Sequence, residues 1–256
     1  MDMKAKNMFI HNWNKFFNNA ELPISFYYTD KVWQADLVKP GTGPRCIMSS
    51  LAKVRSGQSL AFDADGVACE GGKTYLGFSS DIGKDMEYFL SYGIPGKVEG
   101  ERLKKTPEIV KQFLQKNDPP LKAPGKYIVF KRWDMLEAED SPAVVIFYAT
   151  ADIISGLMML ASFDEAEQNT VIAPWGSGCS YIVYHPYMET MAPRPRAVMG
   201  GFDISIRSFI PKDRLTFSVP MNKFASMVND MEESFLISKP WKHIQKRITQ
   251  DNPKIS

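Results

Sequence analysis

Cysteine and histidine are scarce in this sequence. Its 256 residues include only three cysteines and three histidines, which is too few for the disulfide framework of a small secreted scaffold. An odd number of cysteines leaves at least one thiol unpaired, as is typical of proteins in a reducing compartment. The N-terminal segment also lacks the apolar stretch of about 7–15 residues that marks a secretory signal peptide. We therefore expect a cytoplasmic protein.

An excess of charge of one sign is also missing. The chain has 31 basic and 29 acidic residues, which gives a formal net charge of +2. Because nucleic-acid binding needs a concentrated basic surface, we expect no nucleic-acid partner. The most apolar stretch, residues 143–163, contains Asp152 near its centre, and a bilayer would penalise that carboxylate by about 2.5–3.5 kcal/mol. We expect no membrane partner and predict a core strand followed by a core helix in this stretch.

Complete cofactor and catalytic motifs are lacking as well. No phosphate-binding G-x-x-x-x-G-K-[S/T] loop occurs, and the glycines at 176 and 178 are not followed by the remaining residues of a dinucleotide fingerprint. The cysteines are far apart in the sequence, whereas structural zinc and ferredoxin sites use closely spaced pairs. The sequence therefore leaves the reaction, the ligand and the oligomeric state unknown.

Hydrophobic periodicity predicts a mixed α+β fold. Apolar residues recur at helical spacing near both ends of the chain, and short β-branched and aromatic runs between them are typical of strands. The predicted helices are residues 5–20, 47–57, 81–92, 106–116, 151–163 and 220–235. The predicted strands are residues 24–28, 59–62, 67–69, 126–132, 143–148, 170–173, 202–209 and 214–219, the last two forming a hairpin.

We predict a single mixed α+β domain over residues 1–256. The order strand, helix, strand and small-residue loop occurs in residues 24–78 and again in residues 143–184. This repetition leaves open an arrangement of two similar halves of β-α-β type, 1–117 and 126–256, joined at the proline-rich segment 117–125.

Each cysteine lies at a predicted structural break. Cys46 follows Arg45 and precedes a helix, so the helix dipole and the guanidinium are both expected to favour its thiolate. Cys69 and Cys179 adjoin glycine pairs. Three such thiols, with His185 as a fourth ligand, are a candidate site for a metal ion or an iron–sulfur centre. The alternative is that each cysteine packs as a small hydrophobic residue, which is common for free cysteine.

The neighbouring glycines are candidate cofactor-binding residues. Gly71 and Gly72 follow Cys69, while Gly176 and Gly178 precede Cys179, and backbone N–H groups at such glycines can point at a bound anion.

Two other sets of polar residues are considered as parts of a site. Asp203 and Arg207 share a face of a predicted strand and are either exposed at an edge or part of a polar pocket wall, whereas acidic groups such as Glu137–Asp140 are expected to be solvated turns.

Several phrases in the sequence resemble the family of domains of unknown function 169, the uncharacterised ArCR. The resemblance covers residues 20–235 and rests on the runs RCIMSSLAKVRSG, CEGGKTYLGF, GSGC and LTFSVPMNKF. The matching positions are Cys46, Ala52, Arg55, Gly57, Cys69, Leu76, Gly77 and Cys179. The resemblance implies a prokaryotic, cytoplasmic protein whose three cysteines act together, adds Arg55 to the candidate cofactor-binding residues, and supplies no reaction.

Three functional hypotheses follow. The first is a cytoplasmic protein that binds a metal or a redox cofactor through Cys46, Cys69 and Cys179. The second is a small-molecule binding module whose glycine loops line a pocket and whose cysteines are purely structural. The third is a protein-interaction or structural protein. None of the three specifies an enzymatic reaction.

Overall fold

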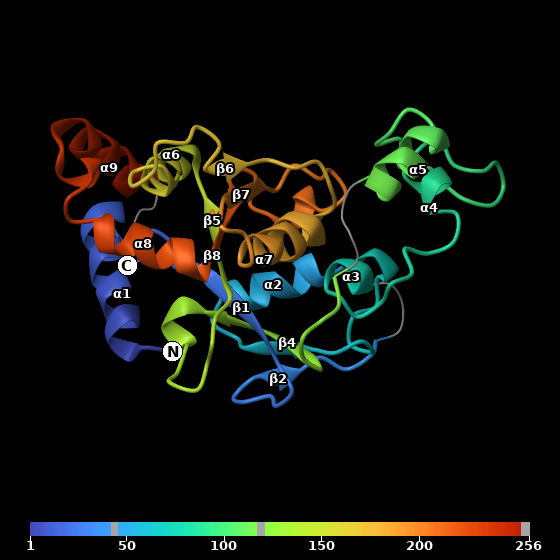
Figure 1. The fold of residues 1–256 in the computed structure, drawn as a ribbon, viewed down its shortest axis with the longest axis horizontal. Coiled ribbons are helices and arrows are strands. Elements are labelled where there is room, and N and C mark those ends of the chain that lie inside the picture. Colours follow the sequence, from blue (N-terminus) through green and yellow to red (C-terminus); the bar gives the residue numbers. More distant parts are fainter. Residues whose placement is uncertain (42–45, 117–120, 252–256) are drawn as a thin grey trace.

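A single eight-stranded sheet forms the centre of the computed structural model, which describes residues 1–41, 46–116 and 121–251. Figure 1 shows the strands twisting between two groups of helices. The strands are β1 (Ile24–Thr29), β2 (Asp36–Leu37), β3 (Leu60–Phe62), β4 (Tyr127–Arg132), β5 (Val144–Ala149), β6 (Val171–Ile172), β7 (Ala197–Gly200) and β8 (Leu215–Pro220). Their spatial order is β2-β3-β4-β1-β5-β8-β7-β6, so the predicted α+β class is confirmed.

The sheet repeats the same pattern on each side of its centre. In the first four strands, β2 pairs with β3 in parallel, β3 with β4 antiparallel, and β4 with β1 antiparallel over six residue pairs. In the other four, β6, β7, β8 and β5 repeat those pairings in the same order. The antiparallel pair β1 and β5 joins the two sets, with Ser25 opposite Val145. The two sets are therefore related by an approximate two-fold axis, and they meet between β1 and β5.

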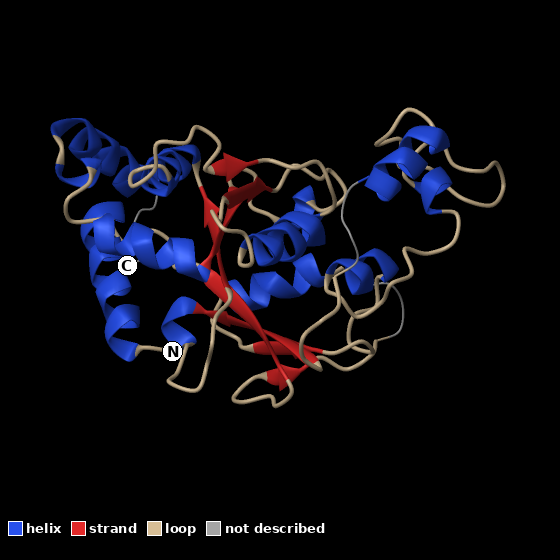
Figure 2. Ribbon diagram, viewed as in Figure 1, coloured by secondary structure: helices blue, strands red, loops and turns tan. Residues whose placement is uncertain are grey.

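Helices cover both faces of the sheet, as Figure 2 shows. On one face lie α1 (Met3–Phe17), α6 (Ala151–Ala161), α8 (Met221–Asp230) and α9 (Lys239–Asp251). On the other lie α2 (Ile47–Arg55), α3 (Glu70–Tyr75), the π-helical turn η2 (Ser180–Tyr184) and α7 (His185–Glu189). Three short 3₁₀ turns are η1 (Trp133–Met135), η3 (Arg207–Phe209) and η4 (Phe235–Ile237).

The first face carries an aromatic core. Phe9, Trp13 and Phe17 lie one helical turn apart on α1, and the rings of Trp13 and Phe17 stack with centroids 4.2 Å apart. Phe147 of β5 and Phe224 of α8 complete the cluster. Because side chains alternate along a strand, Val144, Ile146 and Tyr148 face the opposite side, where α2 packs. Residues of β5 are buried on both faces, which explains its uninterrupted apolar sequence.

A helical segment, residues 81–116, extends away from the sheet. It contains α4 (Met86–Phe89) and α5 (Pro107–Lys116), and Figure 1 shows it standing apart from the helices that cover the sheet. Hydrogen bonds from Glu101 N to Phe89 O and from Lys104 N to Leu90 O, 2.7 and 2.9 Å long, fold the segment back on itself. The predicted helix 81–92 is too long, since only residues 86–89 within it are helical.

Several other predicted elements are corrected by the structure. Residues 67–69 and 202–209 form no strand, and the predicted hairpin does not form because β8 pairs with β5 and β7. The alternating apolar residues at 202, 204 and 206 lie in a loop instead of a strand. Phe202 and Ile204 are exposed, and all three residues line a cavity. The glycine-rich run after Cys69 begins a helix, α3. In the described part of the chain, no helix is long and apolar enough to cross a bilayer.

Asp140 is a buried acid, which corrects its expected place in a solvated turn. Its carboxylate is 0% exposed and lies 3.0 Å from Nζ of Lys131, which is 1% exposed. It also accepts hydrogen bonds from the Tyr27 hydroxyl and, at 2.8 Å, from Glu137 N. These bonds satisfy the acid and the ammonium together, so removing either partner leaves an uncompensated buried charge.

Replacing Asp140 by Ala is therefore expected to lower the free energy of unfolding by about 3–5 kcal/mol, measured by urea denaturation. The double variant Asp140→Leu with Lys131→Met should lose much less, because neither charge remains. The control Lys15→Ala removes an exposed ion pair with Glu232 and should change stability little. Equal losses in the single and double variants would contradict this account.

Candidate functional site

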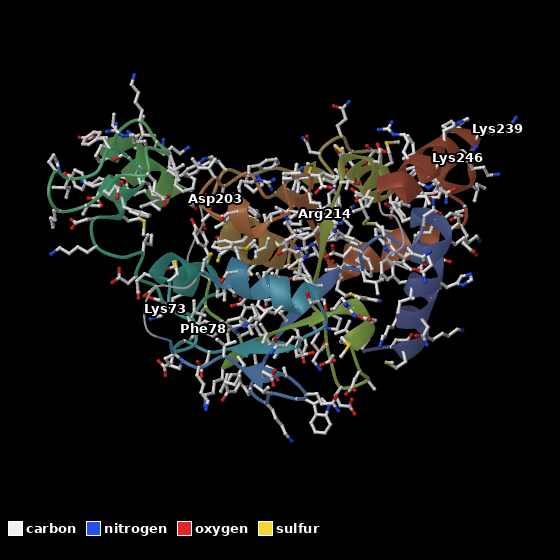
Figure 3. The ribbon with its side chains drawn as sticks, turned by 180° about the vertical axis from the view of Figure 1, so that it is seen from behind. Lys73, Phe78, Asp203, Arg214, Lys239 and Lys246 are labelled. Carbon is white, nitrogen blue, oxygen red and sulfur yellow. The ribbon has the colours of Figure 1, made fainter. Side chains whose placement is uncertain are left out.

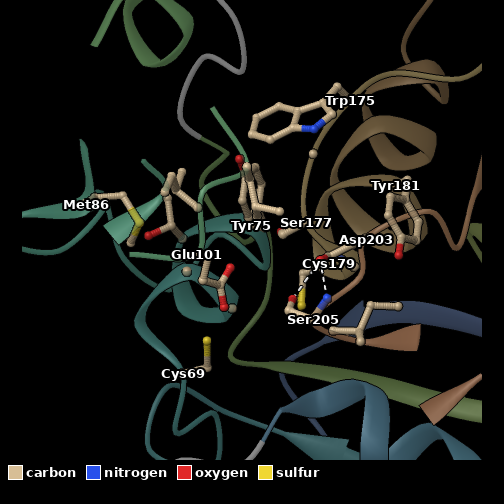
Figure 4. A pocket seen from close by; sticks show the side chains of 18 of the residues that line it. Cys69, Tyr75, Met86, Glu101, Trp175, Ser177, Cys179, Tyr181, Asp203 and Ser205 are labelled. Carbon is tan, nitrogen blue, oxygen red and sulfur yellow. Dashed lines mark hydrogen bonds between the residues drawn. The ribbon is translucent and has the colours of Figure 1, made fainter. Parts of the chain in front are cut away.

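A cavity of about 630 Å³ lies between the sheet body and residues 81–116. Its walls come from five parts of the chain that are distant in sequence, and Figure 4 shows side chains from several of them converging. Those parts are Cys46 at the start of α2, residues 69–75 around α3, residues 82–114 of the helical segment, the loop 173–181 and the loop 202–206. All three cysteines line the cavity.

The repeated topology explains how Cys46 and Cys179 come together. Cys46 directly precedes α2, which lies between β2 and β3 in the chain. Cys179 directly precedes η2, which lies between β6 and β7. The two cysteines therefore occupy corresponding positions on the same face of the sheet, close to its approximate two-fold axis. The third cysteine, Cys69, begins α3 in the first set alone.

Gly72 lies close to both Cys69 and Cys179. A Cβ atom on Gly72 would lie 3.5 Å from Cβ of Cys69, 3.9 Å from Sγ of Cys179 and 3.2 Å from the Val67 side chain. An alanine there would press only against Val67, since the two cysteine contacts are of ordinary length. Gly71 differs, because a Cβ atom there meets nothing within 4 Å although the residue lines the cavity.

Burial dominates the protonation of two of the thiols. Burial raises the pKa of Cys46, although the backbone N–H groups of Met48 and Ser49 act in the opposite direction. Burial also raises the pKa of Cys179 well above its usual range, and the neighbouring Cys46 and Cys69 add to the effect. At Cys46 the helix N-terminus does not outweigh desolvation. Arg45, the other influence expected to favour the thiolate, lies outside the described residues.

A four-ligand metal site finds no support in the structure. Within the described ranges, no group of three or more His, Cys, Asp or Glu side chains is placed to hold a metal ion. His185 does not line the cavity; it begins α7, where its ring packs against Tyr184 with centroids 5.1 Å apart. Its backbone is helical rather than extended as predicted, because Pro186 sits in the first turn, where a helix tolerates proline.

The glycine loop beside Cys179 binds an anion that belongs to the protein itself. Gly178 N donates a 3.0 Å hydrogen bond to Oδ2 of Asp203, whose Oδ1 accepts bonds from N and Oγ of Ser205 at 3.0 and 2.6 Å. A side chain at position 176 would require Ser180 to move, because a Cβ on Gly176 would collide with the Ser180 hydroxyl. The Gly178 N–H is thus occupied and is not available to a bound phosphate or carboxylate.

Two of the predicted polar residues lie away from the cavity. Arg55 makes a bidentate ion pair with Glu21, at 2.6 and 2.8 Å, and its guanidinium lies 4.5 Å from the centre of the Tyr148 ring. Arg207 donates to the backbone oxygens of Arg214 and Lys212 instead of sharing a strand face with Asp203. Both arginines therefore hold parts of the fold together.

Aromatic side chains close one end of the cavity. The rings of Phe113 on α5 and Trp175 in the loop 173–181 meet edge to face, with centroids 4.9 Å apart. Nζ of Lys104 lies 3.6 Å from the centre of the Trp175 ring and 5.5 Å from that of Phe113. This cation–π contact joins the helical segment to the sheet body.

Several lining residues were not predicted from the sequence. Glu101, Phe113, Trp175 and Tyr181 belong to no motif, and they meet only because the helical segment folds over the sheet body. The proline and glycine around Trp175 indicated a loop, but gave no sign of what the loop contacts. Asp203 was considered for a pocket wall and does line the cavity, from a loop rather than a strand.

Comparison with family models identifies the chain. The model of the domain of unknown function 169, described as uncharacterised ArCR, matches residues 15–230. The protein belongs to this family. The match confirms the resemblance seen in the sequence and includes all five parts of the chain that line the cavity. Searches of curated proteins and of solved structures found no match.

The three thiols should differ in their reaction with N-ethylmaleimide. Cys69 is exposed, Cys46 is half-buried and Cys179 is buried, and only the thiolate reacts. We expect the labelling rate to decrease in the order Cys69, Cys46, Cys179, as measured by peptide mass spectrometry. Because the pKa of Cys46 is raised, its labelling rate should still be increasing at about pH 9, by up to about tenfold per pH unit. Labelling in urea is the control, and equal native rates for Cys69 and Cys179 would contradict the structure.

Proposed function

We propose that this protein binds a small, largely apolar molecule in the cavity between the sheet body and residues 81–116. The supporting observation is the cavity itself. Its volume of about 630 Å³ lies within the range of about 300–1,000 Å³ that is usual for small-molecule sites. A wall that is mainly apolar, with a few converging polar groups, is also usual for such sites.

The apolar lining supplies the affinity in this proposal. Side chains from both banks contribute, among them Met86, Phe89, Leu103, Phe113, Trp175 and Ile206. Burial of apolar ligand surface contributes roughly 25 cal/mol per Å² before the costs of association. The rim also includes Phe202 and Ile204, which are 48% and 70% exposed. A ligand that covers them would remove apolar surface from water on both partners.

The cavity can be filled by substitution at Gly71. A side chain there meets open space within the cavity lining, so Gly71→Phe is expected to fill part of the volume. Gly71→Ala is the matched control, since it adds only a methyl group at the same position and leaves the cavity open. The alanine variant is expected to be as stable as the wild type or more stable by about 0.5–1 kcal/mol.

Nile red, a neutral dye that fluoresces in apolar surroundings, provides the probe. We expect the wild type and Gly71→Ala to bind the dye with similar affinity, and Gly71→Phe to bind it at least about tenfold more weakly, equivalent to about 1.4 kcal/mol. Circular dichroism confirms that each variant is folded. Dye binding that is the same in the alanine and phenylalanine variants, or absent from all three proteins, would overturn the proposed function.

Thiol chemistry in the same cavity is a second candidate, because all three cysteines line it. A redox or metal-binding role requires the sulfur atoms, whereas apolar binding requires only their volume. Replacing Cys46, Cys69 and Cys179 by alanine together separates the two roles. Retained Nile red binding and unchanged metal content after anaerobic purification would leave the cysteines a packing role, whereas loss of a metal or a visible absorption band would support the thiol role.

A further inference from the structure

The charged side chains that line the cavity are all acidic. Among its described lining residues, Glu101 and Asp203 carry charge, and no lysine, arginine or histidine is present. Figure 4 shows them on opposite banks, with Glu101 on the helical segment and Asp203 beside Cys179. Figure 3, seen from behind, places Asp203 at the junction between the helical segment and the sheet body. The polar part of the cavity is therefore negative.

Asp203 is held firmly in place. The bonds from Gly178 N, Ser205 N and the Ser205 hydroxyl fix both of its oxygens, and each of these donors is neutral. The described residues supply no ion-pair partner for this carboxylate. Neutral donors orient a charge but do not cancel its field in the cavity.

Glu101 experiences that field. Its backbone N–H bonds to Phe89 O at 2.7 Å, but its carboxylate makes no ion pair or hydrogen bond within the described part of the chain. Burial, and then the charge of Asp203, raise the pKa of Glu101. Two carboxylates that share a partly desolvated space repel each other, and a cation between them would remove this repulsion.

The Tyr181 hydroxyl is a third polar group at the same place. The residue is 1% exposed and lines the cavity, and its buried oxygen faces the backbone N–H groups of Gly201 and Asp203. In Figure 4 the hydroxyl points toward the region of Asp203. The hydroxyl therefore helps to position the loop that carries Asp203.

Lys104, a cation beside the cavity, contacts aromatic rings and not the two acidic side chains. Lys104 lies against the Trp175 and Phe113 rings, at 3.6 and 5.5 Å, and does not line the cavity. It therefore strengthens the closed end rather than neutralising the acidic groups. Its position also makes that end less favourable for a cationic group, which orients a ligand with its charge toward Glu101 and Asp203.

We propose that the cavity selects an apolar molecule with one positively charged amine. The ammonium group lies between the Glu101 and Asp203 carboxylates, and the apolar body lies against the wall near Phe113 and Trp175. An anionic ligand of the same shape is excluded by the two carboxylates. This inference rests on the proposed function and adds the charge of the ligand to it.

Phenethylamine and 3-phenylpropionate test this selectivity, because they share an aromatic ring and a two-carbon chain and differ in charge. In NMR titrations at neutral pH, we expect the wild type to bind phenethylamine at least about tenfold more tightly, a difference of about 1.4 kcal/mol. Glu101→Gln keeps the shape of the side chain and should reduce this preference several-fold. Glu99→Gln removes an exposed charge from the same segment, outside the cavity lining, and should leave the preference intact.

The possible results separate the two proposals. Equal or tighter binding of phenylpropionate, together with Nile red binding that Gly71→Phe abolishes, would overturn the inference about charge and leave the proposed function standing. An equal loss of preference in Glu101→Gln and Glu99→Gln would overturn the role of Glu101, because the effect would then reflect net charge alone. Absence of binding by both fragments and by Nile red would overturn both proposals.

Discussion

The antiparallel pairing of β1 with β5 is the contact on which the rest of the structure depends. Ile24 lies opposite Ile146 and Phe26 opposite Val144, and each of these strands then pairs over its whole length with β4 or β8. Because the two four-stranded sets meet at this pair about an approximate two-fold axis, α2 and η2 fall on the same face. Their first turns bring Cys46 and Cys179 to one cavity wall. The site is thus a consequence of sheet topology before any particular side chain is considered.

The helical segment supplies what the repeated part of the fold lacks. Two related helices alone would present a shallow, thiol-lined surface, whereas residues 81–116 add an opposite bank and enclose a volume of about 630 Å³. The Phe113 and Trp175 contact fastens this bank to the loop before Cys179. Because the loop glycine N–H is used by Asp203, the enclosed space offers acids and apolar groups to a ligand, and not the anion-binding backbone that its glycines suggested.

Local sequence patterns predicted the elements that bury one clear face. The apolar stripe of α1, the uninterrupted strand β5 and the proline that precedes α8 each correspond to an observed element. Predictions from local sequence patterns were wrong where tertiary contacts decide the backbone conformation. The alternating residues of the loop 202–206 resemble a strand, and the two glycines of α3 resemble a turn, but one region lines a cavity and the other begins a helix at Cys69.

The candidate site was predictable only in part. A site shared by the three cysteines was predicted from their positions beside loops and from the family resemblance, and all three line one cavity. The acidic and aromatic residues opposite them could not be inferred, since no local pattern shows that residues 101 and 113 meet residues 175 and 203. His185 was a candidate because of its residue type and Arg55 because of the family resemblance, yet His185 packs against Tyr184 and Arg55 pairs with Glu21.

A crystal structure determined under xenon pressure tests the central claim most directly, because xenon enters apolar protein cavities and is located by its anomalous scattering. The account predicts a xenon site among Met86, Phe113, Trp175 and Cys179, with residues 81–116 held away from the loop 202–206. A structure in which the helical segment packs directly against that loop, with its own side chains filling the space and no xenon bound there, would contradict the account.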